Sequence, residues 1–211
     1  MTQPALARQF VDRLADLLAQ APCPDTGGET FAAAVASEMR GAVLSVNATP
    51  AQSRNRYPDW GGLTTLAASQ TSVELITLLR ELEPLLPWIE GSHFWPAQEH
   101  RYFAEKMWGA LVIGEAGAAF YAEERYIMML HTMAPHCVYP LHEHRIPEGY
   151  FIIGGHVDWS RDGEHWEPRP PGSLFYNESW APHSIRTHDE PLLSLDVYLP
   201  PFGWEGGLTT E

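Results

Sequence analysis

One stretch of this chain limits its fold and chemistry more than any other: residues 139–150, which read Tyr-Pro-Leu-His-Glu-His-Arg-Ile-Pro-Glu-Gly-Tyr. His142 and His144 lie two residues apart, so on an extended strand both imidazoles leave the same face. Glu148 follows an Ile-Pro turn and can return to that face as an anionic ligand. The spacing therefore predicts a strand that carries a metal site.

A histidine further along the chain can complete this site. His183 stands about one β-hairpin beyond the first cluster and can supply a fourth ligand from a later strand. Imidazole and carboxylate ligands suit several divalent first-row metals. We therefore expect one divalent transition metal ion, with Fe(II), Mn(II) and Zn(II) as the leading candidates. We expect structural or surface roles for the histidines that lack ligand spacing: His100, His131, His136, His156, His165 and His188.

The composition limits the class of protein and its partners. The chain has 211 residues, 45% of them hydrophobic and 19% charged, which is typical of a folded domain. A formal net charge of −14 argues against nucleic acid or an anionic membrane surface as a partner. The sequence has no run near the roughly 20 apolar residues of a membrane span and no signal-peptide pattern. We expect a cytoplasmic protein, with a homodimer left open.

The periodicity of apolar residues changes along the chain. Helical spacing predicts three helices, over residues 5–20, 30–44 and 72–82. A loop rich in Pro and Gly is expected over residues 47–62. From about residue 102, short β-type runs alternate with turns, and we predict strands over residues 109–114, 125–131, 137–139, 149–155, 172–175 and 192–199.

This order of elements predicts a mainly β protein with a helical start. Short strands separated by turns are typical of an antiparallel barrel or a double-sheet jelly roll. We expect residues 1–100 to form a helical N-terminal extension and residues 101–211 to form the barrel that carries the metal site. The two cysteines, Cys23 and Cys137, predict neither a disulfide framework nor a CxxC zinc site.

The predicted metal ligands resemble those of the cupin superfamily. The His-x-His-x-x-x-Glu run, followed by six residues and Gly155, is similar to the first cupin motif. His183, after Pro182, stands where the second motif has its histidine. The chain departs from the pattern at His136, where the first motif has Gly, and at Thr187, where the second often has Asn. The resemblance implies a double-stranded β-helix, the jelly-roll barrel of the cupins.

Within that superfamily, the chain is most similar to the cupin-type dimethylsulfoniopropionate (DMSP) lyases. Tyr139 lies three residues before the first histidine and Tyr150 lies two residues after the glutamate, as in that group. The Tyr-Pro-x-His-x-His arrangement is the most discriminating part of a resemblance that covers roughly residues 108–200. A helical segment of about a hundred residues before the barrel also matches the longer members.

The resemblance implies a metal-dependent lyase that cleaves DMSP, a small zwitterion, to dimethyl sulfide and acrylate by β-elimination. A metal that binds the substrate carboxylate lowers the pKa of the α-proton, and a base removes this proton as the neutral sulfide departs. The resemblance gives Tyr139 as the first candidate for that base. It gives Tyr150 as the second, as a proton relay or as a contact to substrate and metal.

A sulfonium group is bound well by aromatic faces. We expect substrate contacts from four aromatic residues in or next to the barrel: Tyr102, Trp108, Trp180 and Tyr198. Residues 92–95, which read Ser-His-Phe-Trp, are a candidate segment for covering the barrel mouth.

Two other classes of function stay open at this point. A cupin dioxygenase or isomerase would use the same metal on another small carboxylate or sugar, and it would not need Tyr139. A non-catalytic ligand-binding cupin would lose its ligand with its metal and would show no turnover.

Overall fold

The computed structural model of the chain describes residues 2–46, 56–115, 119–123, 125–202 and 205–209. The longer helices come first in the sequence: α1 (Gln3–Leu18), α2 (Gly28–Gly41), α3 (Trp60–Gln70) and α4 (Val73–Leu82). Shorter helical segments follow: η1 (Glu83–Leu85), α5 (Gly91–Phe94), η2 (Gln98–His100) and α6 (Arg101–Ala104).

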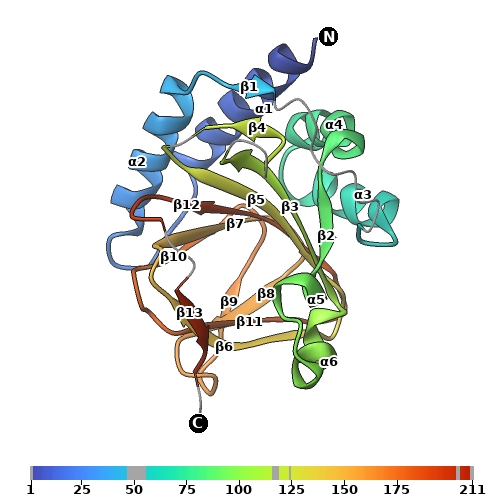
Figure 1. Ribbon diagram of the computed structural model, residues 1–211, viewed down its shortest axis with the longest axis vertical. Coiled ribbons are helices and arrows are strands. Elements are labelled where there is room, and N and C mark those ends of the chain that lie inside the picture. The colour runs from blue at the N-terminus through green and yellow to red at the C-terminus, as the bar shows by residue number, and fades with distance from the viewer. Residues whose placement is uncertain (1, 47–55, 116–118, 124, 203–204, 210–211) are drawn as a thin grey trace.

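Two mostly antiparallel sheets account for the strands of the described residues (Figure 1). The larger sheet has the order β1-β4-β3-β5-β12-β7-β10, with β2 beside β3. Its strands are β1 (Ser45–Val46), β2 (Trp88–Glu90), β3 (Met107–Gly114), β4 (Tyr121–Ala122), β5 (Ile127–Met133), β7 (Glu148–Gly154), β10 (Leu174–Asn177) and β12 (Leu192–Tyr198). The smaller sheet has the order β13-β6-β11-β8-β9. Its strands are β6 (Val138–His144), β8 (Val157–Ser160), β9 (Glu167–Arg169), β11 (His183–Thr187) and β13 (Gly206–Leu208).

The chain crosses repeatedly between the two sheets. Strands β5, β7, β10 and β12 belong to the larger sheet, while β6, β8, β9 and β11 belong to the smaller one. Figure 1 shows the two sheets facing each other across an interior. This alternation is the double-stranded β-helix that the sequence predicts, and the predicted fold class is confirmed.

The four longer helices cover the outer face of the larger sheet (Figure 1). Helix α3 packs on β7 and β12, and helix α2 packs on β7 and β10. Buried apolar side chains from the helices and from this face form one continuous core. Representative members of that core are Phe10, Leu14, Ile76, Leu130 and Leu195. Burial of this kind stabilises the fold by about 25 cal/mol per Å² of apolar surface removed from water.

Alternation along β12 shows how the helices shape the interior of the barrel. All seven residues of β12 are buried, because both of its faces are covered. Leu193, Leu195 and Val197 face the core under the helices, whereas Asp196 and Tyr198 line a cavity inside the barrel. The outer face supplies most of the apolar packing and leaves the inner face free to carry polar groups.

The predicted helices are confirmed within two or three residues at each end, as α1, α2 and α4. The predicted strands are confirmed as β3, β5, β6, β7, β10 and β12. Asp162 and Gly163 lie in the connection between the paired strands β8 and β9. The end of the predicted loop over residues 47–62 is wrong, because Trp60 begins α3, and residues 47–55 lie outside the described residues. Asp59 caps this helix by accepting a hydrogen bond from the backbone N–H of Gly62.

The strands β1 and β2 precede residue 100 but pair with β4 and β3 of the larger sheet. These two strands therefore join the N-terminal region to the larger sheet. The domain boundary between residues 100 and 101 stays a prediction. Cys23 and Cys137 are both free thiols.

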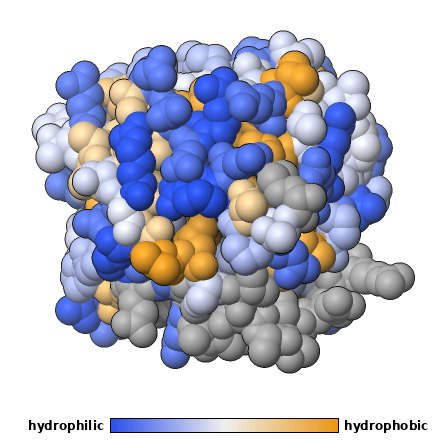
Figure 2. Space-filling view, turned by 90° about the horizontal axis from the view of Figure 1, so that it is seen from above, coloured by the Kyte–Doolittle hydropathy of each residue, from blue (hydrophilic) through white to orange (hydrophobic). Residues whose placement is uncertain are grey.

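The surface above the helices is polar. Seen from above in Figure 2, hydrophilic side chains predominate among the coloured residues, and hydrophobic ones appear in separate patches. The apolar stripes of the helices therefore face the sheet. Among the described residues, no helix combines the length and apolar character needed to cross a membrane.

Close packing of α3 on β7 depends on a glycine. A β-carbon added at Gly154 would lie 2.6 Å from Cβ and 2.8 Å from Cα of Ala67, so the helix backbone would have to move. We expect Gly154→Ala to lower the free energy of unfolding by about 1–3 kcal/mol, measured by urea denaturation. Gly61→Ala is the matched control, because nothing lies within 4 Å of its added β-carbon. Equal midpoints for the Gly154 variant and the wild type would contradict this packing.

Candidate active site

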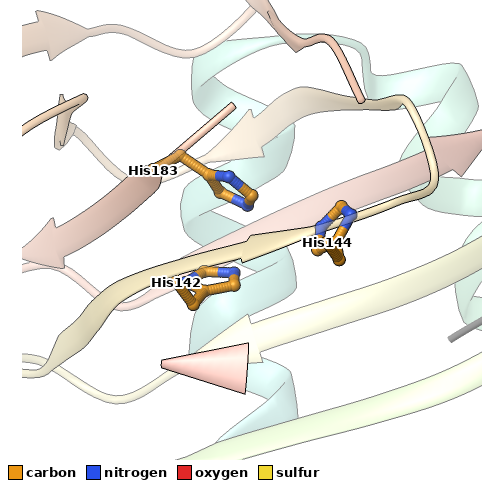
Figure 3. A group of neighbouring side chains, drawn as sticks. All are labelled: His142, His144 and His183. Carbon is orange, nitrogen blue, oxygen red and sulfur yellow. The ribbon is translucent and has the colours of Figure 1, made fainter. Parts of the chain in front are cut away.

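Three histidines meet between two neighbouring strands of the smaller sheet. His142 and His144 lie on β6, and His183 begins β11 directly opposite His142 in the strand register. Figure 3 shows the three imidazoles turned toward a common point. Their candidate ligand nitrogens all lie within 4.8 Å of one another. The spacing of two residues on β6 and the pairing with β11 together produce this cluster.

Each of the three rings is oriented by a backbone carbonyl. Nδ1 of His142 lies 2.8 Å from the oxygen of Pro140, Nδ1 of His144 lies 2.8 Å from that of Ile146, and Nδ1 of His183 lies 2.9 Å from that of Ala181. A carbonyl oxygen only accepts hydrogen bonds, so each Nδ1 carries the proton and donates it. The Nε2 lone pairs are therefore available to a metal, as in most histidine metal sites.

Glu148 reaches the cluster from the other sheet. It begins β7, and its Oε2 lies 3.0 Å from Nε2 of His144 and 3.2 Å from Nε2 of His183. Burial alone would raise the pKa of Glu148, but His144 and His183 hold this pKa well below its usual value. The carboxylate is therefore ionised inside the protein.

The protonation of the histidines follows from the same contacts. Burial, and then the nearby His183, lower the pKa of His142 well below its usual value. Burial also opposes protonation of His144, but the charge of Glu148 and its hydrogen bond raise the pKa of His144 overall. The site thus holds both neutral and readily protonated imidazoles around one anion.

This donor set fits a divalent metal ion. Nε2 of His183 is buried and has no hydrogen-bond partner of good geometry among the described residues. A buried group of this kind is costly unless something binds it. Three imidazole nitrogens and one carboxylate oxygen gathered in one cluster supply the ligands that borderline divalent metals prefer. The structure therefore contains a candidate metal site built from both sheets.

A cavity of 720 Å³ opens beside the candidate metal site. Its lining includes His142, His144 and Glu148 at one end. The aromatic residues that line it are Phe94, Trp95, Trp108, Tyr139, Tyr150 and Tyr198. A pocket of this size and apolar character is typical of small-molecule binding sites.

Tyr139 lies against the candidate metal ligands. Its ring stacks on that of His142, with centroids 4.0 Å apart and planes 22° from parallel. Its phenol oxygen accepts a hydrogen bond of 3.1 Å from the indole N–H of Trp95. Burial and then the negative charges of Glu148 and Asp196 raise the pKa of Tyr139, while the hydrogen bond from Trp95 lowers it in part. The contact with Trp95 thus favours the phenolate form that a base requires.

Tyr150 and Tyr198 lie deeper, on the larger sheet. Tyr198 stands opposite Glu148 and Tyr150 stands opposite Asp196 in the register of β12 and β7. Burial raises the pKa of both phenols, and the negative charge of Glu148 raises each further. Tyr198 also hydrogen-bonds Glu148. Both side chains line the cavity, so they are placed to contact a bound molecule.

The four aromatic residues expected to contact substrate fall into two groups. Trp108 and Tyr198 line the cavity. Tyr102 on α6 is 63% exposed, Trp180 is 47% exposed, and neither belongs to the cavity lining. Their predicted role in substrate binding stays a prediction without a contact to support it. His93, Phe94 and Trp95 of the 92–95 segment do line the cavity.

Three residues of the cavity escaped the sequence reasoning. Trp95 was expected only as part of the 92–95 segment that covers the barrel mouth, and His131, expected to be structural or at the surface, is buried in the cavity lining. Asp196 was not singled out, although a charged residue within the apolar run of β12 is an unusual signal. The strands that pair with β12 could not be predicted from the sequence.

Comparison with known proteins identifies the family. The family model for DMSP lyases matches residues 35–194, which is well over half of the chain. A curated relative, dimethylsulfoniopropionate lyase DddQ from Ruegeria pomeroyi, is 30% identical over 99 residues. That alignment covers 47% of this chain and only 45% of the relative's length.

Solved structures share the fold over almost the whole chain. The crystal structure of the DMSP lyase DddQ from Ruegeria pomeroyi has a TM-score of 0.70 and 20% identity, with 99% of this chain and 98% of that chain covered. A structure of the DMSP lyases RdDddP and RnDddQII has a TM-score of 0.71 and 17% identity, with 98% of each chain covered. At these identities the likeness establishes the shared fold.

The fold and the histidine cluster define a cupin barrel with an N-terminal helical region. The chain belongs to the DMSP lyase family, because the family model matches most of its length.

We expect His144→Ala to weaken metal binding by more than the roughly 10–100-fold that loss of an outer-shell partner costs, because it removes a donor nitrogen. The measurement is the metal content of purified protein by mass spectrometry. His165→Ala is the control, since its side chain is 86% exposed and pairs with Asp162 at the surface. An unchanged metal content in the His144 variant would exclude His144 as a ligand.

Proposed function

We propose that the protein is a metal-dependent carbon–sulfur lyase that cleaves DMSP to dimethyl sulfide and acrylate. Family membership supports the substrate class. The observation that carries the proposal is the position of Tyr139, which stacks on His142 at the edge of the histidine cluster and faces the cavity. A phenol at this position can take a proton from a molecule bound beside the cluster.

His142, His144, Glu148 and His183 would hold the metal ion, and Fe(II), Mn(II) and Zn(II) are the candidates that suit this donor set. When bound, such an ion acts as a Lewis acid toward the substrate carboxylate and adds positive charge that favours a nearby phenolate. The three backbone carbonyls behind the imidazoles fix the rings in the orientation that ligation requires.

The reaction needs a base and a path for the leaving group. We propose that the phenolate of Tyr139 removes the proton from the α-carbon. The electron pair of that C–H bond forms the new C=C bond, and the bond between the β-carbon and sulfur breaks. Dimethyl sulfide leaves as a neutral molecule, so no acid is required for it, and the phenol returns its proton to solvent.

Tyr139 is preferred over Tyr150 as the base for a reason visible in the contacts. Trp95 donates a hydrogen bond to the phenol oxygen of Tyr139, which stabilises the phenolate. Tyr150 instead stacks on Phe175, with centroids 4.8 Å apart, and stands opposite Asp196. Burial and the carboxylates of Glu148 and Asp196 raise the pKa of both phenols, but the hydrogen bond from Trp95 offsets part of this rise at Tyr139. We therefore assign Tyr150 to substrate contact.

The activity is tested by headspace gas chromatography of dimethyl sulfide after DMSP is added to protein loaded separately with Fe(II), Mn(II) or Zn(II). We expect release with at least one of these metals and none after treatment with a chelator. Absence of dimethyl sulfide with all three metals would reject the lyase. The dioxygenase, isomerase and ligand-binding classes would then be the functions left to test.

We expect Tyr139→Phe to keep its bound metal and to lower kcat by about 100-fold or more, as loss of a general base does. Tyr102→Phe is the matched control, because this exposed phenol lies outside the cavity. In the wild type, kcat should rise with pH, since the active form of the base is the phenolate. Near-normal turnover by the Tyr139 variant would assign the base to another group.

A further inference from the structure

A second polar cluster lines the cavity on the side of the larger sheet. Asp196 on β12 and His131 on β5 are both buried, and Nδ1 of His131 lies 3.3 Å from Oδ2 of Asp196. The two strands are neighbours (Figure 1), and Ser194 is the cross-strand partner of His131. The mechanism proposed above uses none of these residues, so their burial in the cavity wall needs another explanation.

The hydrogen bonds of this cluster are incomplete. Oδ1 of Asp196 accepts a bond of 2.7 Å from the hydroxyl of Ser194. Within the described part of the chain, Nε2 of His131 has no hydrogen-bond partner, and Nδ1 of His131 and Oδ2 of Asp196 face each other at 3.3 Å without good hydrogen-bond geometry. A buried polar atom left without a partner destabilises the folded protein. Groups retained at that cost beside a cavity commonly serve a ligand.

The charge of the cavity wall indicates the kind of ligand. Among the described residues that line the cavity, none is lysine or arginine, and the carboxylates are Glu148 and Asp196. Glu148 is already in contact with His144 and His183. In the described part of the chain, the ion-pairing partner of Asp196 is His131. The wall is therefore suited to a ligand with a positive group.

Burial and the neighbouring groups together set the charge of Asp196. Burial raises the pKa of Asp196 to about 6, and the negative charge of Glu148 also raises it, while His131 and the bond from Ser194 lower it. The carboxylate is ionised above that pH. Tyr150, directly opposite on β7, adds an aromatic ring beside it, and ring faces also attract cations.

The positions of Glu148 and Asp196 in the sheet suit a short zwitterion. Asp196 stands opposite Tyr150, and Glu148 lies two residues before Tyr150 on the same strand. The Cα atoms of diagonal neighbours of this kind are about 7–8 Å apart in an antiparallel pair. DMSP has two methylene carbons between its carboxyl carbon and its sulfur. With the carboxylate at the histidine cluster, the sulfonium group can therefore lie near Asp196.

We propose that Asp196, anchored by Ser194 and flanked by His131, binds the cationic end of the substrate and makes the cavity select sulfonium or quaternary ammonium carboxylates over neutral carboxylates of the same shape. This inference rests on the proposed function for the orientation of the substrate. It adds a specificity-determining residue on the wall opposite the histidine cluster.

Two ligands that differ in one charge test the proposal. 3-(Trimethylammonio)propanoate and 4,4-dimethylpentanoate have the same shape and the same carboxylate, but only the first carries a cation. Both affinities are measured by isothermal titration calorimetry on Zn(II)-loaded protein. We expect the wild type to bind the cationic ligand about tenfold or more tightly than the neutral one, as a desolvated charge pair would.

Asp196→Asn removes the charge and keeps the shape of the side chain. We expect the preference for the cationic ligand to fall to about twofold or less, while affinity for the neutral ligand stays near the wild-type value. Asp158→Asn is the matched control, since it also removes one negative charge. The Asp158 carboxylate binds Arg186 at 2.7 Å and lies outside the cavity lining. This control should keep the wild-type preference.

Three results would overturn the proposal. One is equal affinity of the wild type for both ligands, a comparison that holds even if Asp196→Asn does not fold. The second is an equal loss of both affinities in Asp196→Asn, which would give the residue a structural role only. The third is the same loss of preference in Asp158→Asn. Failure of the lyase itself is seen separately, as absence of dimethyl sulfide from DMSP.

Discussion

The packing of helices α1–α4 on the outer face of the larger sheet is the constraint on which the site depends. This layer forms the principal apolar core, from Phe10 and Leu14 in α1 to Leu130 and Leu195 in the sheet. Because hydrophobic stabilisation is gained outside the barrel, the inner face can hold ionisable groups that would otherwise weaken a small β-barrel. Asp196 illustrates the consequence, since it is fully buried between two residues of that outer core.

The candidate metal site also depends on the orientation of its imidazole rings, which the protein itself fixes. The carbonyl oxygens of Pro140, Ile146 and Ala181 each fix one imidazole through its Nδ1. These contacts are local, because each carbonyl lies two residues from its histidine in the sequence. The strand backbone itself therefore sets the tautomers, and no separate shell of carboxylates is needed behind the rings.

The two histidines of β6 could be predicted from their local spacing. Residues that enter the site through the pairing of distant strands could not be predicted. The interval between His142 and His144 fixes their shared face on any strand, and the amphipathic pattern around Leu14 fixes α1. Helix α3 was missed because its apolar pattern is weak and its start lies beside a Pro and Gly-rich segment. Asp196 enters the site only because β12 pairs with both β5 and β7, which no local pattern reveals.

The two carboxylates of the cavity have opposite roles because their neighbours differ. Glu148 meets His144 and His183, so its charge is balanced within the protein and its pKa is held low. Asp196 meets one imidazole and one hydroxyl, and burial raises its pKa. One end of the cavity, at the histidine cluster, can therefore bind an anion through a metal ion. The other end carries the negative charge of Asp196. A zwitterion placed along this axis matches both ends, whereas the reverse orientation would bring like charges together at Asp196.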